Sequence, residues 1–326
     1  MGNCFGKLKK STAEIAPSDY VKGSPTVRLY GSPHSNLTSY IRFALLYKPL
    51  SLHFVPSETP DFGSESPVLQ FGSESVSGSL QTLVQYIESK FPNPPLMSYG
   101  SRYDDKTPPV AAAAALHHRS MVWHVERLVR WADDLAVRGG KAGGNPAVGS
   151  PRMEVRKFGR SYSQLLDLML EHAQMEEIIV FPILEMADRG LSKAANEEHA
   201  RDLPIMNGIR EDIKSIGVLD SGSPVYQEAL FNLSTRLKTL QEHCVEHFEA
   251  EERDLLPLLE AAELSAEQHE RVLEQCLDVM KGTHSNLFRF FIEGLRPQDA
   301  MQYMDLIIRC SDEDRVSSMF RMLLES

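Results

Sequence analysis

The sequence has few of the features that would place a protein in a bilayer, in an oxidising compartment or on nucleic acid. No apolar run in its 326 residues approaches the length of a membrane span. No signal peptide is present and no cysteines have C-x2-C spacing, so we expect a reduced, cytoplasmic setting. No basic stretch is long enough for a nucleic-acid site, and the net charge of -11 argues against such binding and favours the capture of cations. The cysteines are Cys4, Cys244, Cys276 and Cys310.

The polar tail of residues 1–24 begins with a possible acylation signal. Once Met1 is removed, Gly2 is available for myristate, and Cys4 could take palmitate. Three lysines follow by residue 10, although residue 6 is glycine where the motif prefers serine or threonine. One acyl chain holds a protein only marginally, so the cysteine and the lysines would make the anchor stable. We expect a peripheral association with the plasma membrane; an unmodified tail is the alternative.

Residues 25–97 have the pattern of a small α/β domain. Strands are predicted at 27–30 and 50–55 around a helix at 38–47, then a hairpin at 67–71 and 74–76 and a helix at 79–90. This order resembles the thioredoxin-like N-terminal domain of glutathione transferases. The resemblance implies that Ser32 or Ser35 could activate glutathione, but Ser79 and Leu80 stand where the family has its glutathione-holding pair. A retained fold, or a module that binds a protein partner, is therefore favoured over an active transferase.

The remainder of the chain is predicted to be helical. A polar linker covers residues 98–109, a helical bundle covers 110–283, and a C-terminal helical extension covers 284–326. Helices are expected at about 110–137, 152–188, 191–217, 224–262 and 265–282, with shorter ones after them. The cluster around Phe288 and Phe291 is expected in the core or on a dimer surface.

A motif occurs twice in this helical region. The segments that begin at His172 and at His247 both read H-x3-E-E-x3-(F/L)-P-x-L. A histidine and a glutamate four residues apart lie on one face of a helix, so His172 with Glu176, and His247 with Glu251, can direct an imidazole and a carboxylate at one point. Two such segments packed antiparallel could surround a pair of metal ions. The proline in each copy is predicted to end or bend its helix just beyond this level.

Further histidines lie on the neighbouring predicted helices. His118 falls in the apolar stripe of the first helix, whereas His117 points about 100° away around that helix. His199 lies on the third helix, where Pro204 predicts a kink or a restart. Three histidines remain alternative ligands, and they are His117, His124 and His243.

One histidine on each of four helices, with a glutamate on the second and fourth, resembles the hemerythrin-like (HHE) cation-binding family over about residues 110–262. The resemblance implies an up-down four-helix bundle that holds two iron ions. The implied terminal ligands are His118, His172, His199 and His247, and the implied bridging ligands are Glu176 and Glu251. Zinc or another divalent metal is an alternative to iron.

The expected protein is thus mainly α, with a thioredoxin-like α/β module joined to a hemerythrin-like bundle. Its expected function is to bind or sense iron or dioxygen, and catalysis is not required. Four histidines and two glutamates leave room for dioxygen, so a carrier, a sensor and an oxidase are all compatible with the pattern. The rival functions are a glutathione-transferase-like enzyme and a metal-free, membrane-tethered adaptor.

Overall fold

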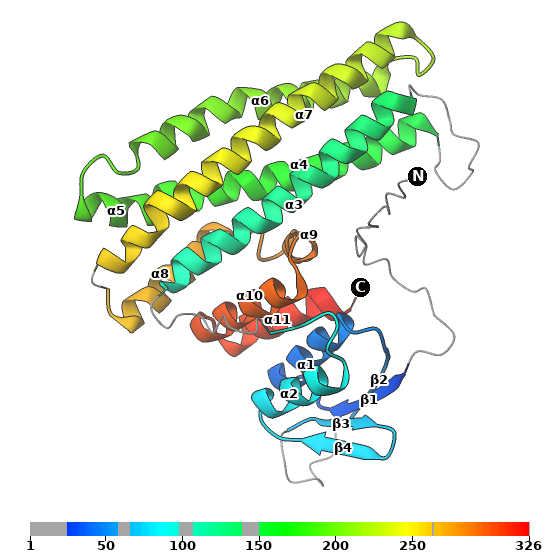
Figure 1. The fold of residues 1–326 in the computed structure, drawn as a ribbon, viewed down its shortest axis with the longest axis vertical. Helices are drawn as coiled ribbons and strands as arrows, with labels where there is room; N and C mark the ends of the chain where they lie inside the picture. The colour runs from blue at the N-terminus through cyan, green and yellow to red at the C-terminus, as the bar shows by residue number, and fades with distance from the viewer. Residues whose placement is uncertain (1–24, 58–65, 98–106, 139–149, 263, 326) are drawn as a thin grey trace, which may run out of the picture.

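The computed structural model describes residues 25–57, 66–97, 107–138, 150–262 and 264–325. The predicted acylation sites Gly2 and Cys4 lie outside the described residues, as does most of the predicted linker. Figure 1 shows a small α/β module, a bundle of long helices and a group of C-terminal helices between the two. Within the described part of the chain, no helix is both long enough and apolar enough to cross a membrane.

The N-terminal module is a small mixed sheet with two helices. Its elements are β1 (Thr26–Gly31), α1 (Asn36–Leu46), β2 (Ser51–Pro56), β3 (Val68–Phe71), β4 (Glu74–Ser77) and α2 (Leu80–Lys90). β1 pairs in parallel with β2 and antiparallel with β3, and β3 pairs antiparallel with β4. A parallel pair needs a crossover connection, which α1 provides. The predicted strand, helix, strand unit and the hairpin are therefore confirmed.

The serines considered for glutathione chemistry make local backbone contacts. The Ser35 hydroxyl caps α1 by accepting a hydrogen bond from the backbone N–H of Thr38, and Ser79 caps α2 in the same way. The Ser32 hydroxyl accepts a hydrogen bond from the backbone N–H of His34. Serine is a preferred N-cap residue, so the positions of Ser35 and Ser79 are accounted for by helix initiation.

Four long helices form the bundle. They are α3 (Pro109–Arg138), α4 (Pro151–Met175), α6 (Lys193–Val218) and α7 (Pro224–Ala250). Figure 1 shows successive helices running in opposite directions; α3 packs on α4 and α7, and α6 packs on the same two helices. Ser150 and Ser223 cap α4 and α7, and each is followed by a proline, a favoured first residue of a helix. The structure thus has the predicted up-down arrangement.

The second and fourth bundle helices change their winding where proline was predicted to end or bend them. The π-helical segments η1 (Glu176–Val180) and η2 (Glu251–Leu255) lead into α5 (Phe181–Ala187) and the 3-10 segment η3 (Leu256–Ala262). Proline has no N–H and its ring disturbs the preceding turn, so the hydrogen bonds shift to a wider spacing. The N–H of Phe181 donates to the carbonyl of Glu176, and that of Leu256 donates to the carbonyl of Glu251. Each helix therefore widens and continues, and the wide turn begins at a motif glutamate.

Helix α6 runs through Pro204 without the predicted restart. A proline at this position leaves the carbonyl of Ala200 without its helical donor. Both residues are exposed, so water can satisfy that carbonyl and the helix continues. His199, five residues before this proline, consequently lies in regular helix.

The C-terminal helices connect the bundle to the N-terminal module. They are α8 (Ala266–Val279), α9 (Phe288–Glu293), α10 (Pro297–Cys310) and α11 (Glu313–Leu324). Helices α8, α9 and α10 pack on α3, whereas α11 packs on α1. The Tyr40 hydroxyl of α1 donates to Asp305 Oδ1 of α10 at 2.7 Å. Phe288 and Phe291 are fully buried within the chain, so this cluster belongs to the core.

Candidate metal centre

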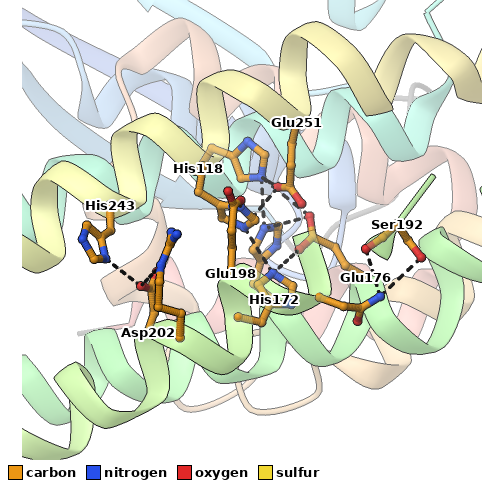
Figure 2. A network of polar contacts seen from close by, with 12 residues as sticks. His118, His172, Glu176, Ser192, Glu198, Asp202, His243 and Glu251 are labelled. Carbon is orange, nitrogen blue, oxygen red and sulfur yellow. Dashed lines mark hydrogen bonds and ion pairs between the residues drawn. The ribbon is translucent and has the colours of Figure 1, made fainter. Parts of the chain in front are cut away.

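The structure brings all six residues of the proposed ligand set to one level of the bundle. They are His118 on α3, His172 on α4, Glu176 at the start of η1, His199 on α6, His247 on α7 and Glu251 at the start of η2. Figure 2 shows side chains from different helices, among them His118, Glu176 and Glu251, pointing toward one another. His199 is the least enclosed, with 11% of its side chain exposed.

The imidazoles meet in two pairs. The Nε2 atoms of His118 and His172 are 3.0 Å apart, and those of His199 and His247 are 3.1 Å apart. Two imidazoles that bind one ion at right angles, each at 2.0–2.1 Å, would place their nitrogens about 3.0 Å apart. Two nitrogens this close share at most one proton, so each pair presents a lone pair that suits a cation.

The two glutamates lie between the imidazole pairs. Glu176 Oε1 is 3.1 Å from Nε2 of His172, and its Oε2 is 3.5 Å from Nε2 of His199. Glu251 Oε2 is 3.4 Å from Nε2 of His118 and 3.6 Å from Nε2 of His247. Each carboxylate therefore reaches one imidazole of each pair.

Neither of these carboxylates has a well-formed hydrogen bond. Glu176 is 0% exposed and Glu251 is 2% exposed, yet their side-chain oxygens have no hydrogen-bond partner among the described residues. Burying a carboxylate is costly unless a cation or donors compensate it. The donor set of imidazoles and carboxylates therefore fits a divalent metal.

The ligands divide into two clusters that share both carboxylates. The α3–α4 cluster comprises His118 and His172 with Glu176 and Glu251, and the α6–α7 cluster comprises His199 and His247 with the same two glutamates. In each cluster, one ligand atom per residue can be chosen so that all lie within 4.8 Å of one another. Each cluster is therefore able to hold a metal ion.

Three of the four imidazoles have a carboxylate at their outer nitrogen. His118 Nδ1 donates to Glu252 Oε1 at 2.9 Å, and His199 Nδ1 donates to Glu177 Oε1 at 3.0 Å. His247 Nδ1 donates to Glu198 Oε2 at 2.7 Å. Such partners orient metal-binding imidazoles and raise their basicity. Glu177 and Glu252 follow the shared glutamates in the sequence motif, whereas nothing in the motif predicted the contact of Glu198 with His247.

His172 is the exception. Its Nδ1 is buried and has no hydrogen-bond partner among the residues that the structure describes. The ring lies edge-on to the ring of His117, with centroids 5.4 Å apart and an interplanar angle of 88°.

The carboxylates control the charge of the imidazoles in the metal-free site. Burial alone would lower the pKa of His118, but contacts with Glu176, Glu251 and Glu252 outweigh burial and hold that pKa well above its usual value. Burial also opposes the charge of His199, yet Glu176 and Glu177 raise its pKa to about 9. The pKa of His172 is lowered, chiefly by burial. Protonated His118 and His199 thus compensate the carboxylates when metal is absent.

The three alternative histidines lie outside both clusters. His117 Nε2 is 2.8 Å from the Tyr303 hydroxyl, and His124 Nε2 donates to the carbonyl of Phe290 at 2.7 Å. Burial lowers the pKa of His124 to about 3, so this imidazole is neutral. His243 Nδ1 is 2.8 Å from Asp202 Oδ1, a contact that Figure 2 shows to one side of the clusters. The spacing in the sequence does not decide whether these three histidines are ligands, because their partners lie on other helices.

A cavity of about 180 Å³ adjoins the clusters inside the bundle. His172, His199 and His247 lie in its wall, and the remaining wall is mostly apolar, with Met121, Met206 and Phe248. Leu170 of α4 and Leu203 of α6 also line it, and both are exposed, so the opening lies between these two helices. A small ligand could therefore approach three of the four imidazoles.

Comparison with known families supports the same chemistry. Residues 112–259 match the family model described as the Hemerythrin HHE cation binding domain. The matched range contains all six residues of the two clusters and ends before α8. No curated protein matches the chain. The family match and the buried clusters together identify a cation-binding protein.

Proposed function

We propose that the bundle of residues 110–283 binds two iron ions, one in each cluster, and that the protein binds or senses iron or dioxygen. The observation that carries this proposal is the pair of buried carboxylates without well-formed hydrogen bonds, each next to one imidazole of each pair. One positive ion per cluster would compensate both carboxylates at once.

The donor set of imidazole and carboxylate is compatible with iron and also with zinc. The choice of iron rests on the resemblance of the bundle to hemerythrin-like proteins. His118 and His172 would hold one ion, His199 and His247 would hold the other, and Glu176 and Glu251 would contribute to both sites. Bound iron would supply one-electron redox chemistry and a coordination position for dioxygen. The apolar cavity gives a small molecule such as dioxygen access to this level of the bundle.

The test is the metal content of protein purified in air, measured for the parent and for His172→Ala, His247→Ala and His243→Ala. The parent is expected to contain about two iron ions per chain, and each of the first two variants about half of that or less. His243→Ala is the matched control, because His243 lies on α7 one turn before His247 but outside both clusters. Equal metal content in all four proteins would contradict the ligand assignment.

We also propose that Gly2 and Cys4 are acylated and tether the protein to the plasma membrane. The support is the sequence Met1-Gly2-Asn3-Cys4 with the three lysines that follow it. Gly2→Ala should move the protein from the membrane fraction to the soluble fraction of expressing cells. An unchanged distribution would count against acylation. In the tethered protein, the proposed thioredoxin-like module would be available to a protein partner in the cytoplasm.

A further inference from the structure

The two copies of the motif have equivalent surroundings, with one difference. Glu177 and Glu252, at the same position of the two copies, support His199 and His118 on the neighbouring helices. Glu198, the residue before His199, supports His247. The corresponding residue before His118 is His117. His117 lies edge-on to the ring of His172, as Glu198 lies next to His247, but without the hydrogen bond that Glu198 makes.

The C-terminal helices determine which nitrogen of His117 carries the proton. His284 Nδ1 lies 2.8 Å from the carbonyl of Met280, which can only accept, so Nδ1 is protonated. Burial lowers the pKa of His284 to about 4, so this ring is neutral and its Nε2 is an acceptor. The Tyr303 hydroxyl, 2.6 Å away, therefore donates to His284 Nε2. The hydroxyl oxygen of Tyr303 therefore accepts a hydrogen bond from His117 Nε2 at 2.8 Å.

This chain of hydrogen bonds leaves a matched donor and acceptor on adjacent rings. A neutral His117 that donates through Nε2 has its lone pair at Nδ1, and this atom has no partner among the described residues. A neutral His172 that presents its Nε2 lone pair to a cation carries its proton at Nδ1, which is also buried and without a described partner. The two Nδ1 atoms are not hydrogen-bonded to each other in this structure, so the bond would form only after a small turn of the two adjacent rings.

We propose that His117 is the positioning residue for His172, accepting a hydrogen bond from His172 Nδ1 when the α3–α4 cluster holds metal. Tyr303 and His284 lie beyond residues 112–259, so the C-terminal extension fixes the orientation of a metal-binding imidazole in the bundle. This inference rests on the proposed metal-binding function. It also assigns His172 a weaker acceptor than the carboxylate that supports His247.

The experiment compares His117→Phe with His124→Phe after loading with Co²⁺. Both histidines are buried on α3 and bonded to C-terminal helices, so both substitutions should disturb packing, but only His117 adjoins a cluster. His117→Phe is expected to weaken binding at the α3–α4 cluster by about tenfold to 100-fold, the usual effect of losing such a partner. His124→Phe should leave the affinity unchanged.

A second readout is the proton NMR spectrum of the Co²⁺-loaded proteins. Each imidazole bound through Nε2 should give one strongly shifted, exchangeable Nδ1–H signal, and His117→Phe should lose or broaden the signal of His172 alone. If His117→Phe does not fold, Tyr303→Phe tests the same contact by removing one hydroxyl. If the parent binds Co²⁺ and His117→Phe has the same affinity and the same spectrum, this inference is overturned and the proposed function is left intact. A parent that takes up no metal would overturn both.

Discussion

The α3–α4 and α6–α7 clusters have the same donors but different surroundings. Each has two imidazoles and shares Glu176 and Glu251, yet only the α6–α7 cluster has a carboxylate behind both imidazoles. The α6–α7 cluster also contributes both of its histidines to the cavity wall, whereas the α3–α4 cluster contributes only His172. Carboxylate partners increase ligand basicity and an opening speeds entry, so the two clusters should differ in affinity and rate although their ligands match. We expect the α6–α7 cluster to load first.

The largest expected effect comes from a residue that the two clusters share. Glu176→Gln should weaken binding at both clusters by more than about 100-fold, because it removes a ligand from each and not only an outer partner. Isothermal titration calorimetry with the metal measures this loss of affinity. Glu249→Gln, an exposed change on α7, is the control and should bind like the parent. A variant that loses only one equivalent of metal would show that Glu176 serves a single cluster.

The order of loading should reverse when the outer carboxylates of the α6–α7 cluster are removed. The double variant Glu177→Gln with Glu198→Gln should weaken that cluster by about tenfold to 100-fold per contact, while Glu252→Gln should weaken only the α3–α4 cluster. The first equivalent of Co²⁺ then reports which cluster fills, through its shifted proton signals. If the first equivalent occupies the same cluster in both variants, the outer carboxylates do not explain the difference.

Metal affinity should rise with pH. The pKa of His118 is well above its usual value and that of His199 is about 9, so both imidazoles are protonated in the metal-free protein at neutral pH. Binding must release these protons, so apparent affinity should increase from about pH 6 to about pH 9. In a buffer series, calorimetry should detect proton release at pH 7. The His199→Asn variant should release about one proton fewer; an equal release would contradict the assignment.

The raised pKa of His199 has the opposite effect on the stability of the metal-free protein, which should fall as the pH rises. The folded state raises the pKa of His199 above the unfolded value near 6.5, so protonation favours folding. This contribution is complete below about pH 6.5 and disappears as the pH rises through about 9. Metal-loaded protein should lack this loss, since metal replaces the proton. Urea unfolding with and without metal over this range makes the comparison.

The smallest expected effect concerns the hydrogen bonds between the bundle and the C-terminal helices. Tyr303→Phe leaves the Nε2 atoms of His117 and His284 buried without their partner. The free energy of unfolding of the metal-free protein should fall by about 1–3 kcal/mol, the cost of unsatisfied buried polar groups. Tyr86→Phe, at a solvent-exposed hydroxyl of the N-terminal module, is the control and should change stability less. Equal losses would mean that the buried contacts contribute nothing specific.

The sequence predicted the parts of this arrangement that depend on local periodicity. The spacing of His172 and Glu176 within one helical turn, and its repetition at His247 and Glu251, was enough to place them on one face. The apolar stripe singled out His118 over His117 on α3. Long-range partners were beyond such reasoning, because the contacts of His117 with Tyr303 and of His247 with Glu198 depend on how separate helices pack.

The backbone conformation at the prolines could also not be predicted fully from the sequence. Both motif prolines were expected to end or bend their helices, whereas the backbone widens at Glu176 and Glu251 and then continues. The restart expected at Pro204 is absent because its freed carbonyl lies on an exposed face. The sequence locates the missing N–H, but the response of the backbone depends on whether neighbouring residues or water can satisfy the carbonyl.

Anaerobic titration of the metal-free protein with Fe²⁺ shows whether one bundle holds two metal ions in unequal clusters. We predict saturation at two equivalents in two resolved steps, with the α6–α7 cluster filled first. Saturation at one equivalent, or no saturable binding, would show that the bundle does not hold two ions.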